Sequence, residues 1–192
     1  MNVRQLVLNS IETKLKIALN DESMRAIETA GNAVSSALLR GHKILIAGNG
    51  GSAADAQHFA AELAGKFMNP DRIPLPAIAL TTNTSNLTAI GNDFGYSHVF
   101  SRQTRALGAQ GDIFVGISTS GNSDNIVSAV LTAKKMGLAT IGLLGNNGGV
   151  VSGLCDLPIV VPSDNTQNIQ EAHIMIIHIL CQMVDEAFSG KG

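Results

Sequence analysis

The sequence predicts a three-layer α/β sandwich, in which helices cover both faces of a parallel sheet. Short continuous apolar runs, typical of strands buried on both faces, alternate along the chain with longer segments of helical periodicity. Hydrophobic residues make up 45% of the 192 residues and charged residues 15%, a composition that excludes disorder. This length suits one domain with a substantial core, so we expect residues 1–192 to fold as one unit.

Residues 1–40 hold two predicted helices. Val7, Ile11 and Leu15 recur at helical spacing in the first helix, and Asn20 with its acidic neighbours offers capping groups before the second. The low charge of such an apolar chain indicates that further surface is buried between subunits. We therefore expect a homo-oligomer in which this N-terminal helical segment takes part in subunit packing.

Beyond these helices, the chain alternates between predicted strands and helices. The strands are short apolar runs bounded by Gly, Pro or polar residues. They are expected at 43–47, 75–80, 113–117, 139–144 and 157–161. The helices are expected at 52–67, 87–90, 99–107, 123–136 and 166–188.

Polar, Gly-rich or Ser-rich turns are expected to gather at one edge of this sheet. In α/β sheets, ligands bind beyond the carboxyl ends of the strands. Five such segments are assigned to that edge, and together they favour a ligand crevice more strongly than any one of them alone. They are Gly48–Ser52, Gly91–Asp93, Ser118–Ser123, Gly145–Gly149 and Pro162–Asn165.

The segment Ser118–Ser123 is the most informative of the five, because a predicted strand precedes it and a predicted helix follows it. Four hydroxyl groups and a glycine therefore lie where free backbone N–H groups and the positive end of a helix dipole favour an anion. A phosphate group is one interpretation. The alternative is a Ser-rich helix cap without a ligand.

The Gly-rich turn Gly48–Ser52 argues against a nucleotide cofactor. No Gly-Lys-[Ser/Thr] follows it, so it is no Walker A sequence, and it does not match GxGxxG. The phosphorylated ligand indicated by the Ser-rich turn is therefore expected to be a small molecule.

His58 and Glu62 stand four residues apart on the predicted helix 52–67, so they share one face. Their neighbours are small or apolar, and an ionisable group in such surroundings needs a partner. One interpretation is a structural His–Glu hydrogen bond. The others are a pair of metal ligands, or a base and the group that orients it.

Gln170 and His178 fall on the predicted helix 166–188. On one straight helix they are separated by about 12 Å along the axis and by roughly 80° around it. One small site could not easily use both from a single chain. Either Gln170 precedes the helix proper, or a neighbouring subunit supplies one of the two side chains.

Charge and hydropathy exclude several classes of protein. The net charge of −2 gives no reason to expect a nucleic acid partner, and no apolar stretch is long enough to span a membrane. The first residues lack the apolar segment of a secretory signal. Cys155 and Cys181 belong to no CxxC pair and are expected to be buried and reduced. We expect a cytoplasmic protein.

Taken together and in order, these segments resemble the bacterial phosphoheptose isomerases, a family of sugar-isomerase (SIS) domain proteins. The likeness extends over nearly the whole chain. The Ser-rich turn alone would indicate only the broad SIS superfamily, whereas the combination of motifs is more specific. The motifs are Gly48–Ser52, Gln57–Leu63, Gly91–Gly95, Gly116–Ser123, and Ile169–His173 with His178.

The resemblance implies a five-stranded, flavodoxin-like sheet and a homotetramer with active sites at subunit interfaces. It also implies conversion of sedoheptulose 7-phosphate to D-glycero-D-manno-heptose 7-phosphate through an enediol, the first step towards ADP-heptose and the heptose of lipopolysaccharide. Glu62 and His178 would be the acid/base pair. Phosphate binding is assigned to Ser118, Thr119, Ser120 and Ser123, and the sugar site to Asn49, Gly50, Gly51, Glu62, Asn92, Asp93 and Gln170. The ligands of one zinc ion per subunit would be His58, Glu62, Gln170 and His178.

Three other functions compete with this assignment. One relative within the family binds the replication initiator instead of acting as an isomerase, but it lacks the counterparts of Glu62 and His178, which this chain keeps. A regulatory SIS domain that senses a sugar phosphate would need the Ser-rich turn and neither of those two residues. The same residues could also serve an isomerase of a different sugar phosphate.

Overall fold

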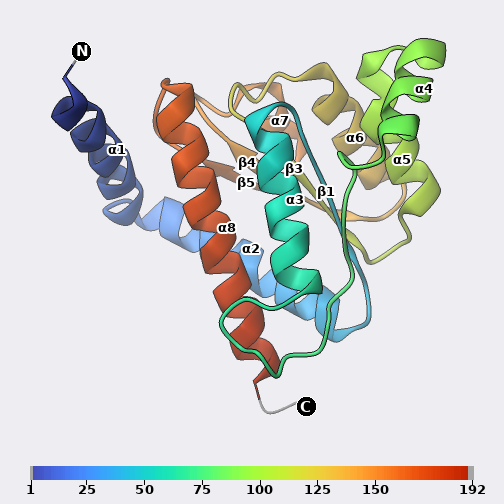
Figure 1. Ribbon diagram of the computed structural model, residues 1–192, viewed down its shortest axis with the longest axis horizontal. Helices are drawn as coiled ribbons and strands as arrows, with labels where there is room; N and C mark the ends of the chain where they lie inside the picture. Colours follow the sequence, from blue (N-terminus) through green and yellow to red (C-terminus); the bar gives the residue numbers. More distant parts are fainter. Residues whose placement is uncertain (1, 190–192) are drawn as a thin grey trace.

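The computed structural model describes residues 2–189 and contains one five-stranded parallel sheet in the order β2-β1-β3-β4-β5 (Figure 1). This order is that of a flavodoxin-like doubly wound sheet, with the topological switch point between β1 and β3. The predicted three-layer α/β fold is confirmed. The strands are β1 (Ile44–Gly48), β2 (Ala77–Ala79), β3 (Ile113–Ser118), β4 (Ala139–Leu144) and β5 (Leu157–Val160).

Helices cover both faces of this sheet. One face packs against α2 (Asp21–Leu39), α3 (Gly51–Ala64) and α8 (Thr166–Phe188). The other face packs against α4 (Thr84–Phe94), α5 (Val99–Leu107), α6 (Asp124–Lys135) and α7 (Gly149–Leu154), with a 3₁₀ turn, η1 (Tyr96–His98), before α5. No helix among the described residues is both long and apolar enough to cross a membrane.

The pleat of the strands divides the core between the two helical layers. Ile44 and Ile46 of β1 contact the layer that holds α3 and α8, whereas Leu45 and Ala47 contact the layer that holds α5 and α6. All four side chains are fully buried. This burial explains why the strands of this sheet read as continuous apolar runs without a polar alternation.

The first helix, α1 (Val3–Ala18), lies outside this sandwich and contacts α2 and α8 (Figure 1). The Lys14 ammonium lies 3.2 Å from the Glu171 carboxylate of α8. Much of its apolar surface is not covered by the residues that the structure describes, and Val7, Ile11 and Leu15 remain about half exposed.

The prediction that Gly91–Asp93 forms a turn at the ligand edge is wrong. These residues lie inside α4, which is longer than the predicted helix 87–90. The Asn83 side chain caps its start by accepting from the Asn86 N–H, and Gly95, with φ of 88°, ends it. Capping at both ends extends the helix across a polar segment that composition alone made turn-like.

The other differences are smaller. The predicted helix 52–67 ends at Ala64, where Gly65 follows, and the predicted strand 75–80 is paired only over 77–79. Pro74 and Pro76 have no N–H to give to a ladder, which shortens that strand. The short helix α7, which begins at the last residue of the Gly-rich segment after β4, was not predicted.

The buried His173 should make the protein less stable in mild acid. Its side chain is fully buried, Nε2 donates to the Leu144 carbonyl at 3.0 Å, and burial lowers its pKa to about 4. Between pH 6.5 and about 4, the unfolded chain binds a proton here that the folded chain does not, so stability falls as the pH decreases through this window, by about 1.4 kcal/mol per unit. Urea unfolding at several pH values should show that slope, and His173→Gln should reduce it. An equal slope in both proteins would contradict the assignment.

Candidate active site

Most of the residues expected to bind ligand gather in two separate regions of the structure. The first is the switch point of the sheet, where the turns after β1 and β3 lie side by side. There the side-chain amides of Asn49 and Asn125 donate to one another, at 2.9 and 2.8 Å. This reciprocal pair joins the Gly-rich turn to the first turn of α6, beside a cavity of about 390 Å³ that Tyr96 and Asp124 also line.

The Ser-rich turn is folded back on itself at this place. The hydroxyls of Ser118 and Ser123 lie 3.0 Å apart, and the Ser120 hydroxyl accepts from the Asn122 N–H at 3.1 Å. Ser123 precedes α6, but its side chain makes no capping hydrogen bond to the helix. The Ser123 side chain therefore does not act as a cap of α6.

The second place is the seam between α3 and α8, where two imidazoles and a carboxylate converge. His58 Nε2 lies 3.0 Å from Glu62 Oε1, and His178 Nε2 lies 3.3 Å from His58 Nε2. The His58 side chain is 43% exposed and that of Glu62 24%. Phe67 stacks on the His178 ring with 5.6 Å between centroids. We call His58, Glu62 and His178 the seam cluster.

The donor set of the seam cluster fits a zinc ion. Its three ligand atoms all lie within 4.8 Å of one another, and imidazole nitrogen and carboxylate oxygen are common zinc ligands. A proton on His58 Nε2 can satisfy Glu62, but His178 Nε2 faces the same nitrogen. One cation in the middle would satisfy all three atoms.

Gln170 is not part of this cluster. It lies within α8, so the explanation that it precedes the helix is wrong. Its side-chain amide lies against Gly51 at the start of α3, where a Cβ would come within 2.5 Å of its nitrogen. In one chain, Gln170 therefore belongs to the first place and His178 to the second.

The length of α3 separates the two places. This helix begins at the carboxyl edge of the sheet and runs back along it, so that Glu62 lies eleven residues, or about 16 Å, from Gly51. Figure 1 shows α3 and α8 side by side and running in the same direction. One chain does not bring its Ser-rich turn and its seam cluster together.

Asn92 and Asp93 join neither place. Both are exposed on α4, and the Asn92 amide donates to the Asp93 carboxylate at 2.7 Å. Figure 1 shows α4 on the opposite side of the sheet from α3 and α8.

Sequence reasoning missed three residues around these places. Asn125 and Phe67 could not be predicted as site residues, because neither belongs to a motif and both residue types are common throughout proteins. Asp55 could have been found, since it lies one turn before His58 on the same helix. Its Oδ2 is buried without a partner among the described residues, and burial raises its pKa while the His58 imidazole opposes that rise.

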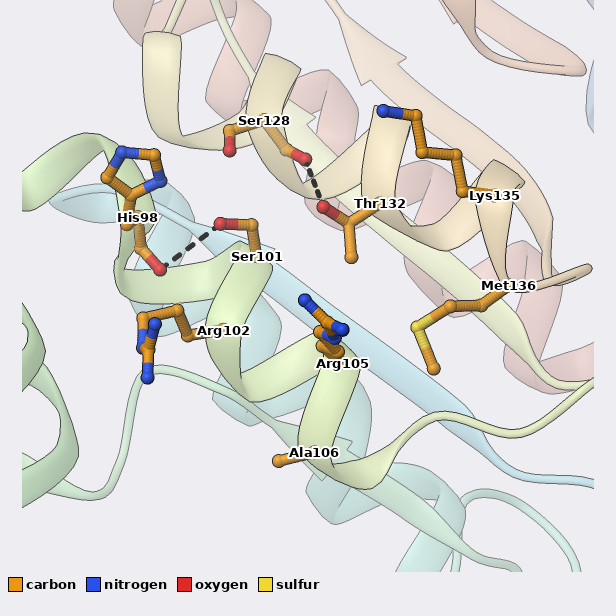
Figure 2. Close-up of a pocket in the computed structure, with 9 residues that line it drawn as sticks. All are labelled: His98, Ser101, Arg102, Arg105, Ala106, Ser128, Thr132, Lys135 and Met136. Atoms are coloured by element: carbon orange, nitrogen blue, oxygen red, sulfur yellow. Dashed lines mark hydrogen bonds between the residues drawn. The ribbon is translucent and has the colours of Figure 1, made fainter. Parts of the chain in front are cut away.

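Another cavity, of about 850 Å³, is lined by none of the expected site residues (Figure 2). It lies between α5 and α6, and its cations include Arg102, Arg105 and Lys135. Arg105 and Lys135 occupy the last turns of their helices, where a cation offsets the negative end of the helix dipole. Arg102 stacks over the Phe94 ring at 3.6 Å. Local helix and ring contacts account for these charges without a ligand.

Known proteins resemble this chain over almost its whole length. The profile of the SIS domain family matches residues 9–145. A phosphoheptose isomerase of Campylobacter concisus is 52% identical over 98% of this chain and 100% of its own. The solved phosphoheptose isomerase of Neisseria gonorrhoeae has a TM-score of 0.89 at 45% identity, covering 96% of this chain and 97% of its own. That of Francisella tularensis has a TM-score of 0.91 at 41% identity, covering 96% of both chains.

A methyl group at Gly121 should disrupt the Ser-rich turn. Gly121 has φ of +66°, and a Cβ there would lie 2.0 Å from the backbone oxygen of Gly148. We expect Gly121→Ala to destabilise the protein by about 1–3 kcal/mol or more, and backbone strain alone accounts for that range. Gly153→Ala is the matched control, because a Cβ there would lie within 4 Å of no atom of residues 2–189 outside its immediate neighbours and its own helix. Thermal unfolding of both variants tests this, and equal melting temperatures would contradict the described turn.

Proposed function

Since the chain belongs to the SIS-domain family and, within it, to the phosphoheptose isomerases, we propose that its substrate is sedoheptulose 7-phosphate. The chain is a sugar-phosphate isomerase. The proposed product is D-glycero-D-manno-heptose 7-phosphate, and the proposed role is the first step towards the heptose of lipopolysaccharide.

The observation that carries this proposal is the convergence of Glu62 and His178 in the seam cluster. Moving a carbonyl between C2 and C1 requires a base that takes a proton from C1 and returns it to C2, with an enediol between. It also requires a group that moves protons between the two oxygens. Glu62 would serve the carbon atoms and His178 the oxygens. A protein that only binds a sugar phosphate needs neither group.

We further propose that the seam cluster holds one zinc ion per subunit, through His58, Glu62 and His178. When bound, the ion would polarise the substrate carbonyl. Gln170, the fourth expected ligand, would have to come from another chain, because its own chain places it at the start of α3. Phe67 would keep the His178 ring in a fixed orientation.

The phosphate group would bind at the switch point of the sheet, where the Ser-rich turn would hold it through Ser118, Thr119, Ser120 and Ser123. The support for this is the turn itself, which puts hydroxyls and free N–H groups at the start of α6. The Gly-rich turn Asn49–Gly51 would line the sugar beside it. If Asn92 and Asp93 line the sugar as expected, another chain would have to supply them.

We propose that the complete site forms between subunits of a homotetramer. Two observations support assembly: the separation of the two places along α3, and the uncovered apolar face of α1. Burial of that face would stabilise an oligomer by the hydrophobic effect. Such burial would also be the packing role proposed for residues 1–40.

Glu62→Gln should abolish turnover of sedoheptulose 7-phosphate while the fold is kept. The substitution preserves the shape of the side chain and removes its basicity, so we expect kcat to fall by at least about 100-fold. The measurement follows the aldose product with and without added zinc. Glu186→Gln, an exposed carboxylate on α8, is the control and should keep full activity. An inactive parent protein, or an active Glu62→Gln variant, would refute the proposed mechanism.

Mixed oligomers should reveal which groups share a chain. Glu62→Gln subunits have an intact Ser-rich turn, and Ser120→Ala/Ser123→Ala subunits have an intact seam cluster. If each site takes its turn from one chain and its cluster from another, co-refolding equal amounts should regain about one quarter of the parent activity at limiting substrate.

The control mixture combines Glu62→Gln with His178→Gln. The contacts of the seam cluster lie within one chain, so no mixed site regains both groups and no activity should return. Recovery in this control, or its absence in the first mixture, would contradict the proposed arrangement.

A further inference from the structure

One side chain outside α3 holds the helical turn that carries Glu62. The Arg72 guanidinium donates to the carbonyl of Glu62 at 2.7 Å and to that of Leu63 at 2.9 Å. The last carbonyls of a helix have no partner within the helix, so Arg72 acts as their cap. The Arg72 Nε donates to the Asp185 carboxylate on α8 at 2.6 Å. We call this pair the Arg72–Asp185 clamp.

The clamp is buried, and each nitrogen of the Arg72 guanidinium and each carboxylate oxygen of Asp185 makes at least one hydrogen bond. The Arg72 side chain is 0% exposed and that of Asp185 5%. The second carboxylate oxygen of Asp185 accepts from the N–H groups of Met68 and Asn69, both at 2.8 Å. Breaking one partner of such a pair leaves an uncompensated buried charge, so the arrangement resists displacement.

The clamp and the seam cluster lie on the same seam of the molecule. Asp185 follows His178 by seven residues, which places the two on one face of α8, about two turns apart. Cys181 lies between them, and burial raises the pKa of its thiol to about 12, with the charges of Glu62 and Asp185 adding to the rise.

We propose that Arg72 and Asp185 are positioning residues for the seam cluster. The clamp ties the last turn of α3 to α8, so it sets how far Glu62 stands from His178. This inference rests on the proposed function, because it concerns the same site. Misplacing a reacting group by about 1 Å can cost about 100-fold in rate, so a tie at this turn affects the chemistry as well as the fold.

The test compares two buried aspartates that have nearly the same contacts. Asp185 accepts from two backbone N–H groups and one arginine, and Asp112 accepts from two backbone N–H groups and one lysine. Both side chains are buried, that of Asp185 at 5% exposure and that of Asp112 at 2%. Asp112 immediately precedes β3 and contacts neither α3 nor α8 through these bonds. Asp185→Asn and Asp112→Asn should therefore lose comparable stability.

Only Asp185→Asn should damage the cluster. We expect its zinc affinity, measured by competition with a chromophoric chelator, to fall by about tenfold or more, and kcat by about tenfold to 100-fold with KM within about twofold. Asp112→Asn should keep both values within about twofold of the parent. Equal effects of the two variants, or no effect of Asp185→Asn, would overturn the proposal.

A second variant covers the case in which Asp185→Asn does not fold. Arg72→Lys keeps the positive charge beside Asp185 but lacks the planar fork that reaches both carbonyls of α3 and the carboxylate at once, so it should weaken zinc binding in a folded protein. Unchanged affinity in Arg72→Lys would also overturn the positioning role. Because zinc alone is the probe, this measurement remains decisive if the parent protein does not isomerise sedoheptulose 7-phosphate, a result that would refute only the proposed function.

Discussion

The direction of α3 is the constraint on which the rest of the site depends. A helix that follows a parallel strand must run back along the sheet, so α3 starts beside the Ser-rich turn and carries Glu62 away from it. The same helix cannot place its first and last turns against one small ligand. The two halves of the chemistry are therefore separated by the basic geometry of the fold, and an assembly that brings two chains together is the direct way to reunite them.

Much of the fold follows from sequence pattern, because burial on both faces gives strands an unmistakable apolar signature. β4 and α8 begin and end where periodicity places them. The pattern failed in α4, where capping by Asn83 and Gly95 extends a helix across polar residues. Local capping geometry was stronger there than composition, and the turn expected at Gly91–Asp93 does not exist.

The candidate site was predictable where the end of a strand or the spacing along one helix decides proximity, as for the turns after β1 and β3. His58 and Glu62 share a face because they are four residues apart, and the structure places them together. The distance between Gln170 and His178 likewise follows from helical geometry. The contribution of Arg72 could not be foreseen, since its loop reaches Asp185 across 113 residues of sequence. Tertiary contacts of that range leave no mark in local pattern.

The charge of the Ser-rich turn determines how strongly ionic strength should affect the binding of a phosphate there. Neither Ser118–Ser123 nor Gly48–Ser52 contains a lysine or arginine. A phosphate held there by this chain would meet hydroxyls, N–H groups and the end of a helix dipole instead of a full positive charge. Screening by ions weakens long-range attraction between net charges far more than short hydrogen bonds. Capture of the substrate by this turn should therefore depend little on ionic strength, and it would rely on random encounter more than on electrostatic steering.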